Sequence, residues 1–84
     1  MTTMGDRIMF EQLEDCTRDA RVSTVDLGGI TIGAYRYETI VFGGALDGYC
    51  MRYRMDGDAR EGHRETVERV LDVEAGYYTT ETRN

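Results

Sequence analysis

The stretch Tyr37-Glu38-Thr39-Ile40-Val41-Phe42 decides the fold, because it is the clearest β-strand in a chain of 84 residues. Every residue of the stretch except Glu38 is aromatic or β-branched, and such side chains favour the extended backbone of a sheet. Glycines follow at positions 43, 44 and 48, and glycine is the residue that a loop with positive φ angles requires. The sequence therefore predicts a strand over residues 37–42 that ends in a glycine-rich loop.

Two neighbouring segments predict that this strand belongs to an antiparallel sheet. Residues 22–27 are rich in Val and Thr, and Gly28-Gly29 favours a tight turn into a returning arm over residues 30–34. Whether residues 30–42 form one bent strand or two short ones stays open. We expect the antiparallel strands to span residues 22–55. Residues 49–55 alternate between two faces, with Tyr49, Met51, Tyr53 and Met55 on one and Cys50, Arg52 and Arg54 on the other.

Residues 59–74 predict an amphipathic helix. Asp58 is a suitable N-cap with Glu61 three residues later, and Gly76 is placed to end the helix in the left-handed conformation. The close spacing of Gly62 and His63 on the apolar stripe predicts a close approach of this helix to the sheet. The stripe contains Ala59, Gly62, His63, Thr66, Val67, Val70 and Val73.

Residues 6–20 predict a second amphipathic helix, with Met9, Phe10, Leu13, Cys16, Thr17 and Ala20 on one side. The expected fold is thus a single α+β domain over residues 1–84 in the order α-β-β-β-α, with both helices on one face of the sheet. The segment 77–84 has a strand-like composition. It is expected to be an edge strand, an arm exchanged with a partner or a frayed end.

Charge and composition exclude several classes of function. The chain carries 16 acidic and 10 basic residues, a net charge of −6, which opposes general binding to nucleic acid or to anionic membranes. No apolar run approaches the ~20 residues of a membrane span, and Met1-Thr2-Thr3-Met4-Gly5-Asp6 lacks the features of a signal peptide. We therefore expect a cytoplasmic protein. Its small core favours a homo-oligomer.

No cofactor or metal is expected. Cys16 and Cys50 are far apart in sequence, and with a single histidine they do not make a zinc site or a convincing disulfide. Asp56-Gly57-Asp58 resembles the start of a calcium loop but lacks the downstream ligand, so turn and cap chemistry is favoured. The sequence contains no catalytic constellation, and we expect no enzyme.

Five residues are candidates for contact with a ligand or partner: Glu38, Arg52, Tyr53, Arg54 and His63. His63 is expected to be buried and neutral, hydrogen-bonded to the backbone or to a hydroxyl. The alternative is an acid/base couple with Glu38. Glu38 is expected to be partly buried and paired with Arg52 or Arg54, while an Arg/Tyr set around Tyr53 suits charge and stacking contacts.

The chain resembles a group of short proteins encoded by phages of actinobacteria. The resemblance covers residues 22–70 and is carried by Tyr37-Glu38-Thr39-Ile40-Val41-Phe42-Gly43, Arg52-Tyr53, Ala59 and Gly62-His63, among others, with Ile40 where the group often has Met. The group implies a role in the cytoplasm of an infected bacterial host and no particular reaction. We expect an accessory protein that binds and modulates a host or phage protein. The alternative is an oligomer that binds a small ligand, such as a nucleotide signal, at a subunit boundary.

Overall fold

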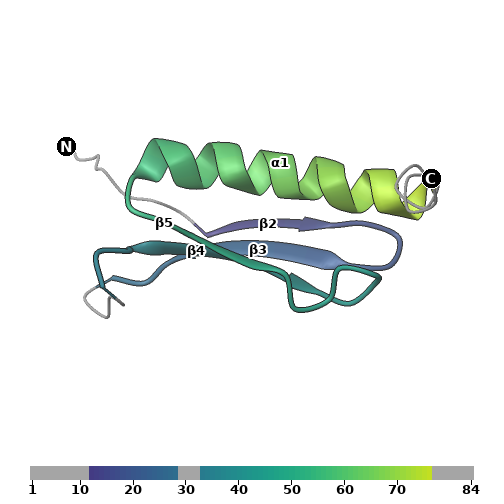
Figure 1. Cartoon of the computed structure of the whole chain (residues 1–84), viewed down its shortest axis with the longest axis horizontal. Helices are drawn as coiled ribbons and strands as arrows, with labels where there is room; N and C mark the ends of the chain where they lie inside the picture. Colours follow the sequence, from purple (N-terminus) through teal and green to yellow (C-terminus); the bar gives the residue numbers. More distant parts are fainter. Residues whose placement is uncertain (1–11, 29–32, 77–84) are drawn as a thin grey trace, which may run out of the picture.

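A computed structural model of the chain describes residues 12–28 and 33–76. These residues form an α+β domain with four strands and one helix (Figure 1). The elements in chain order are β2 (Leu13–Cys16), β3 (Arg21–Asp26), β4 (Tyr37–Phe42), β5 (Cys50–Tyr53) and α1 (Asp56–Glu74).

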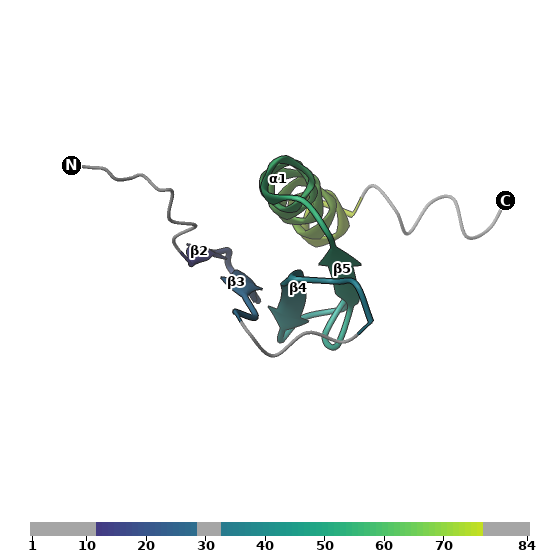
Figure 2. The same cartoon turned by 90° about the vertical axis from the view of Figure 1, so that its left-hand side faces the viewer.

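The strands form one antiparallel sheet in the order β2-β3-β4-β5, so each strand pairs with its neighbour in sequence. Helix α1 lies across one face of this sheet, and no described element covers the other face (Figure 2). The register places Val22 opposite Val41 and Thr24 opposite Thr39 beneath the helix. The predicted single antiparallel sheet is therefore confirmed, with one helix rather than two on its face.

The prediction of a helix over residues 6–20 is wrong in its described part. Residues 6–11 lie outside the described residues, and Leu13–Cys16 is a strand that pairs with β3. A turn joins the two strands, in which the Thr17 N–H donates to the Ala20 carbonyl at 2.8 Å. The apolar residues at helical spacing were misleading, because pairing with β3 and packing against α1 outweigh a weak local preference. Cys16 is consequently exposed on the sheet rather than placed on an apolar helix face.

Helix α1 begins three residues before the predicted start. Asp56 and Asp58 both lie in its first turn, where negative charge is favourable, and Met55 takes the N-cap position without a side-chain hydrogen bond. The prediction that Asp58 caps the helix is therefore wrong. The end of the helix is as expected, since Gly76 has a φ of 89°.

The predicted strands agree with the structure to different degrees. The strands expected at 22–27 and 37–42 are confirmed within one residue, and the strand within 49–55 is shorter than expected. Of the arm expected at 30–34, residues 30–32 lie outside the described residues, and residues 33–34 form a turn before Tyr35. The tail 77–84 also lies outside them.

The core is small and partly polar. Val22, Val41 and Val70 form an apolar cluster with Ala20, and Tyr37 packs with Ala59 in a second one. Thr24, Thr39, His63 and Thr66 are buried between these two clusters, on the same side of the sheet. The space between helix and sheet thus contains a row of buried hydroxyl and imidazole groups.

Candidate functional site

The sheet separates the predicted site residues into different places. His63 and Tyr53 lie between α1 and the sheet, whereas Glu38 and Arg52 face each other on the uncovered side, at opposite positions of β4 and β5. Arg54 follows β5 and stacks over the ring of Tyr35, 5.6 Å from the ring centroid. The five residues therefore do not form one site, and the alternative considered for His63, an acid/base couple with Glu38, is not formed.

His63 is buried and both of its ring nitrogens have partners. Nε2 is 2.7 Å from Oδ2 of Asp15 on β2, and Nδ1 is 2.7 Å from Oγ1 of Thr24 on β3. The Thr24 hydroxyl is in turn 2.5 Å from the hydroxyl of Thr39 on β4. A carboxylate only accepts hydrogen bonds, so Nε2 carries a proton, and in the neutral ring Nδ1 accepts from Thr24. The prediction of a buried histidine bound to a hydroxyl is confirmed.

This row has the order carboxylate, imidazole, hydroxyl that activates a nucleophile in many hydrolases. Thr24 and Thr39 are nevertheless fully buried, while Asp15 is 58% exposed. A substrate therefore meets the carboxylate end of the row and not the hydroxyl. The arrangement holds α1 to three strands, and it does not present a nucleophile.

The row of polar groups extends toward Tyr53 at the far edge of the sheet. Burial raises the pKa of the Tyr53 hydroxyl, and hydrogen bonding with Thr39 and Thr66 acts in the opposite direction. Because the raised pKa exceeds the ordinary value of about 10, the hydroxyl is protonated at neutral pH. Tyr53 is thus a neutral hydrogen-bonding group under the helix rather than a source of charge.

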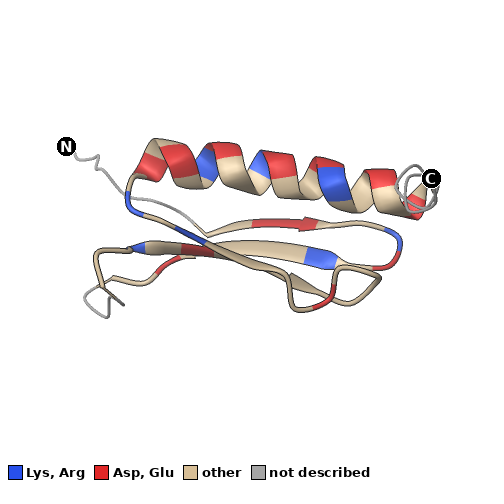
Figure 3. Ribbon diagram, viewed as in Figure 1, with Lys and Arg blue, Asp and Glu red and all other residues tan. Residues whose placement is uncertain are grey.

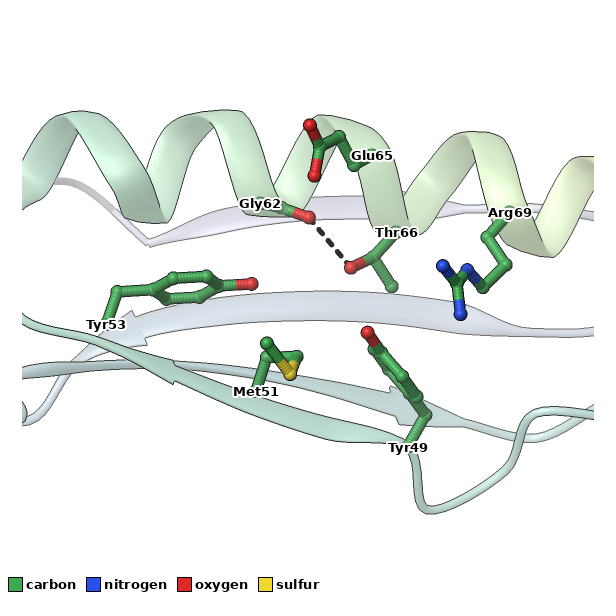
Figure 4. Close-up of a pocket in the computed structure, with 7 residues that line it drawn as sticks. All are labelled: Tyr49, Met51, Tyr53, Gly62, Glu65, Thr66 and Arg69. Carbon is green, nitrogen blue, oxygen red and sulfur yellow. Dashed lines mark hydrogen bonds between the residues drawn. The ribbon is translucent and has the colours of Figure 1, made fainter.

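Tyr53 also lines a small groove between β5 and α1 (Figure 4). The groove measures about 70 Å³, and ligand pockets usually measure roughly 300–1,000 Å³. Tyr53 fills the space beside Gly62, because a Cβ at this position would overlap the Tyr53 hydroxyl and ring. The groove fits a side chain rather than a nucleotide. Its lining residues are Tyr49, Met51 and Tyr53 from β5 and its start, and Gly62, Glu65, Thr66 and Arg69 from α1.

The uncovered face of the sheet carries the predicted ion pair. Nε of Arg52 donates to Oε2 of Glu38 at 3.0 Å, and the Cys50 thiol donates to the same oxygen at 3.3 Å. Burial, with Glu38 as the second cause, raises the pKa of the Cys50 thiol, so the thiolate is disfavoured. The prediction that Glu38 pairs with Arg52 is confirmed, and Cys50 is not an activated nucleophile.

Apolar side chains lie on the same uncovered face. Phe42 is 42% exposed with Arg21 stacked over its ring at 4.5 Å from the centroid, while Val25 and Ile40 are half-buried. The register places all four on one side, because Arg21 lies opposite Phe42 and Val25 lies opposite Glu38. We call Arg21, Val25, Ile40 and Phe42 the open-face cluster.

Most arginines in the described ranges are neutralised by a neighbouring carboxylate. Acidic and basic residues are interspersed along α1 (Figure 3). Six of the eight described arginines take part in an ion pair. The other two are Arg54, over Tyr35, and Arg69, whose guanidinium lies 5.6 Å from the centroid of the Tyr49 ring.

Two kinds of site are absent from the described residues. No group of three or more His, Cys, Asp or Glu side chains within residues 12–28 and 33–76 is placed to hold a metal ion. In the same part of the chain, α1 is too polar to qualify as a membrane-spanning helix.

Several of the residues that carry the resemblance to the phage group pack the fold. Thr39 and His63 belong to the buried polar row, Ala59 is fully buried, and Gly62 admits Tyr53. A Cβ on Gly43 would lie 2.8 Å from the Asp19 carbonyl oxygen. Sequence reasoning missed Asp15 and Thr24, the partners of His63. The four residues Leu13–Cys16 show no apolar/polar alternation, so the sequence carried no local signal for the strand that positions Asp15.

Comparison of the chain with protein-family models, with curated proteins and with solved structures finds no match.

Proposed function

We propose that this chain is a small accessory protein that binds and modulates another protein, either of a phage or of its bacterial host. The resemblance to actinobacteriophage proteins supports a phage origin and a role in the cytoplasm of an infected cell. The single observation that carries the binding role is the open-face cluster, in which an exposed aromatic ring and an arginine lie on a sheet face that no described element covers.

The composition of the cluster supports this role. Aromatic residues and arginine are enriched among the residues that dominate binding energy in protein interfaces. Ionic groups flank the cluster, since the Glu38–Arg52 pair lies on one side and Arg21 bonds Glu14 at 2.5 Å on the other. Ser23 lies opposite Ile40 on the same face, where its hydroxyl accepts from Gln12 at 3.1 Å. Apolar side chains with polar and charged groups beside them are usual in interfaces between separately folded proteins. We do not propose catalysis, because the imidazole row ends in buried hydroxyls.

The test compares two exposed apolar residues of similar accessibility. Phe42 is 42% exposed on the open face, and Leu71 is 47% exposed on α1. Immobilised wild type and Leu71→Asp should retain the same protein from host lysate in stoichiometric amount, whereas Phe42→Asp should not. With the purified partner, calorimetry should show that Phe42→Asp costs at least about 2 kcal/mol of binding free energy. Equal retention by all three proteins, or no stoichiometric partner, contradicts the proposal.

The second candidate function is binding of a small anionic ligand, such as a nucleotide signal, where two subunits meet. Arg54 favours it, because this arginine lies over an exposed tyrosine ring and has no ion pair within the described residues. The groove beside β5 is too small for such a ligand within one subunit. A thermal-shift series with nucleotides should raise the melting temperature of wild type but not of Arg54→Gln. Absence of any shift with wild type excludes this candidate.

We also propose that the chain forms homo-oligomers, because the buried apolar clusters of the described residues are small.

A further inference from the structure

Strand β5 forms one edge of the sheet in the described part of the chain, with β4 as its single neighbour. An edge strand presents unpaired backbone N–H and C=O groups, which an extended segment can pair with as an added strand. The groove between β5 and α1 lies beside this edge and is lined by Tyr49, Met51 and Tyr53. Met51 is 43% exposed, so apolar surface is available next to the unpaired backbone.

Two arginines at this edge can pair with a carboxylate of the occupant, although Glu65 also lines the groove. Arg69 lines the groove, and Arg54 follows the last residue of β5. These two are the described arginines without an ion pair, although the chain as a whole carries a net charge of −6. A segment that runs along β5 therefore meets Arg69 and Glu65 at the groove and Arg54 beyond the end of the strand.

We propose that the edge of β5 and the adjoining groove receive residues 77–82 of a second copy of the chain as an added strand. This inference rests on the proposed self-association and is independent of the binding of another protein. The segment reads Tyr-Tyr-Thr-Thr-Glu-Thr, in which five of six residues are aromatic or β-branched. Glu81 supplies the carboxylate, and a tyrosine supplies a side chain for the groove.

The length of the segment is sufficient. Helix α1 ends at Glu74 and Gly76 turns the chain out of the helix, which leaves eight residues beyond it. Eight extended residues span about 26 Å, and the four residues of β5 span about 13 Å. The exchanged strand can therefore leave one subunit and still cover the whole of β5 in the other.

The handedness of the fold disfavours the same subunit as the acceptor. Strand β5 and helix α1 run in opposite directions, so a strand that follows α1 and lies along β5 in the same chain runs parallel to β5. In Figure 2, α1 lies above the sheet, and β4, β3 and β2 lie to the left of β5, which runs toward the viewer. Turned so that the helix faces the viewer and β5 points upward, the molecule has these three strands to the right of β5. An added parallel strand on its free left edge makes a left-handed crossover, and about 98% of such connections are right-handed. Addition to the β5 of another copy carries no such constraint.

The first test is the mass of two forms of the protein by light scattering at micromolar concentration. The full chain should be a dimer, and a chain that ends at Gly76 should be a monomer with an unchanged circular dichroism spectrum, because all described strands and α1 are retained. A full-length monomer overturns the proposed self-association and the inference, but leaves the binding of another protein intact. A dimer that survives truncation overturns only the inference.

The second test uses Cys50, which is exposed at the first position of β5. In a Cys16→Ser background, Thr79→Cys, Thr80→Cys and Glu81→Cys place a second thiol along the segment. Neighbouring strands bring paired Cβ atoms to about 4.5–5.5 Å, which permits a disulfide. Mild oxidation should give a covalent dimer for at least one position, and none after Cys50→Ser. An intramolecular crosslink, or no Cys50-dependent crosslink at any position, overturns the inference.

Discussion

His63 joins α1 to the sheet through its two ring nitrogens, and the two contacts differ in exposure. Thr24 is fully buried, whereas the Asp15 carboxylate reaches solvent. Loss of a hydrogen bond to a buried group leaves that group without a partner, while a carboxylate at the surface regains water. The contact through Nδ1 should therefore contribute more to folding stability than the contact through Nε2.

This difference predicts an order of stabilities. His63→Ala removes both contacts and leaves a cavity, and should lower the free energy of unfolding by about 2–3 kcal/mol. His63→Asn places an amide near the position of Nδ1 and should cost less than His63→Gln, whose amide reaches toward Asp15. Urea unfolding followed by circular dichroism measures all three variants. Equal stability of His63→Ala and wild type contradicts the structural role of the histidine.

Asp26 makes the stability of the fold depend on pH. Its carboxylate accepts from Nε of Arg36 at 3.0 Å and from the Gly28 N–H at 2.7 Å. The hydrogen bond from Arg36 lowers the pKa of Asp26, while burial opposes the shift. Because the folded pKa is below the unfolded value of about 3.9, the carboxylate stabilises the fold above that pH. This contribution is lost as the pH falls through the folded pKa.

We therefore expect Asp26→Asn to be less stable than wild type at pH 7, with the difference shrinking toward zero as the pH falls below about 4. Arg36→Gln should lose the same acid-sensitive contribution, and the double variant should lose little more. Urea midpoints between pH 7 and pH 2.5 measure the effect. A difference that is constant over this range contradicts the assignment.

The contact of α1 with β5 depends on a glycine that a helix would otherwise disfavour. Replacing a glycine inside a helix with alanine usually stabilises it by up to about 1 kcal/mol. At Gly62 the added methyl group overlaps Tyr53, whereas at Gly57 in the same helix it meets no atom within 4 Å. The same substitution should thus have opposite effects at two positions of one helix.

Gly62→Ala should lower the free energy of unfolding by about 1–3 kcal/mol, the usual cost of an added methylene in a packed site. Gly57→Ala is the matched control and should be neutral or stabilising. In a Tyr53→Ala background the overlap is absent, so Gly62→Ala should become stabilising there. A double-mutant cycle from urea unfolding measures the coupling. Similar effects of Gly62→Ala with and without Tyr53 contradict the proposed overlap.

For the whole molecule, local patterns predicted the elements whose signals are strong along the chain. The β-branched run of β4, the alternation of β5 and the apolar stripe of α1 each match one element of the structure. The sequence also predicted that Glu38 pairs with Arg52 or Arg54, and the register places it opposite Arg52. Strand β2 was missed because only four residues form it, and its pairing with β3 and its contact with α1 depend on residues far along the chain.

The same limit applies to the candidate site. His63 was identified as a candidate because it is the single histidine of the sequence and lies on an apolar stripe. Its partners lie 39 and 48 residues away in sequence. The groove beside β5 was not foreseen, although Gly62 was expected to permit a close approach. The open-face cluster combines residues of β3 and β4, so it follows only from the register of the two strands.

The polar row under α1 has a consequence for the heat capacity of the protein. Among the described residues, the four largest fully buried side chains are two valines and two threonines, and His63 and Thr66 are also buried. Exposure of polar surface lowers the heat-capacity change of unfolding, which for ordinary domains is about 12–15 cal/mol/K per residue. This fold should therefore have a smaller change per residue and a flatter dependence of stability on temperature. Cooling should weaken it less than a domain whose interior is filled with leucine and isoleucine.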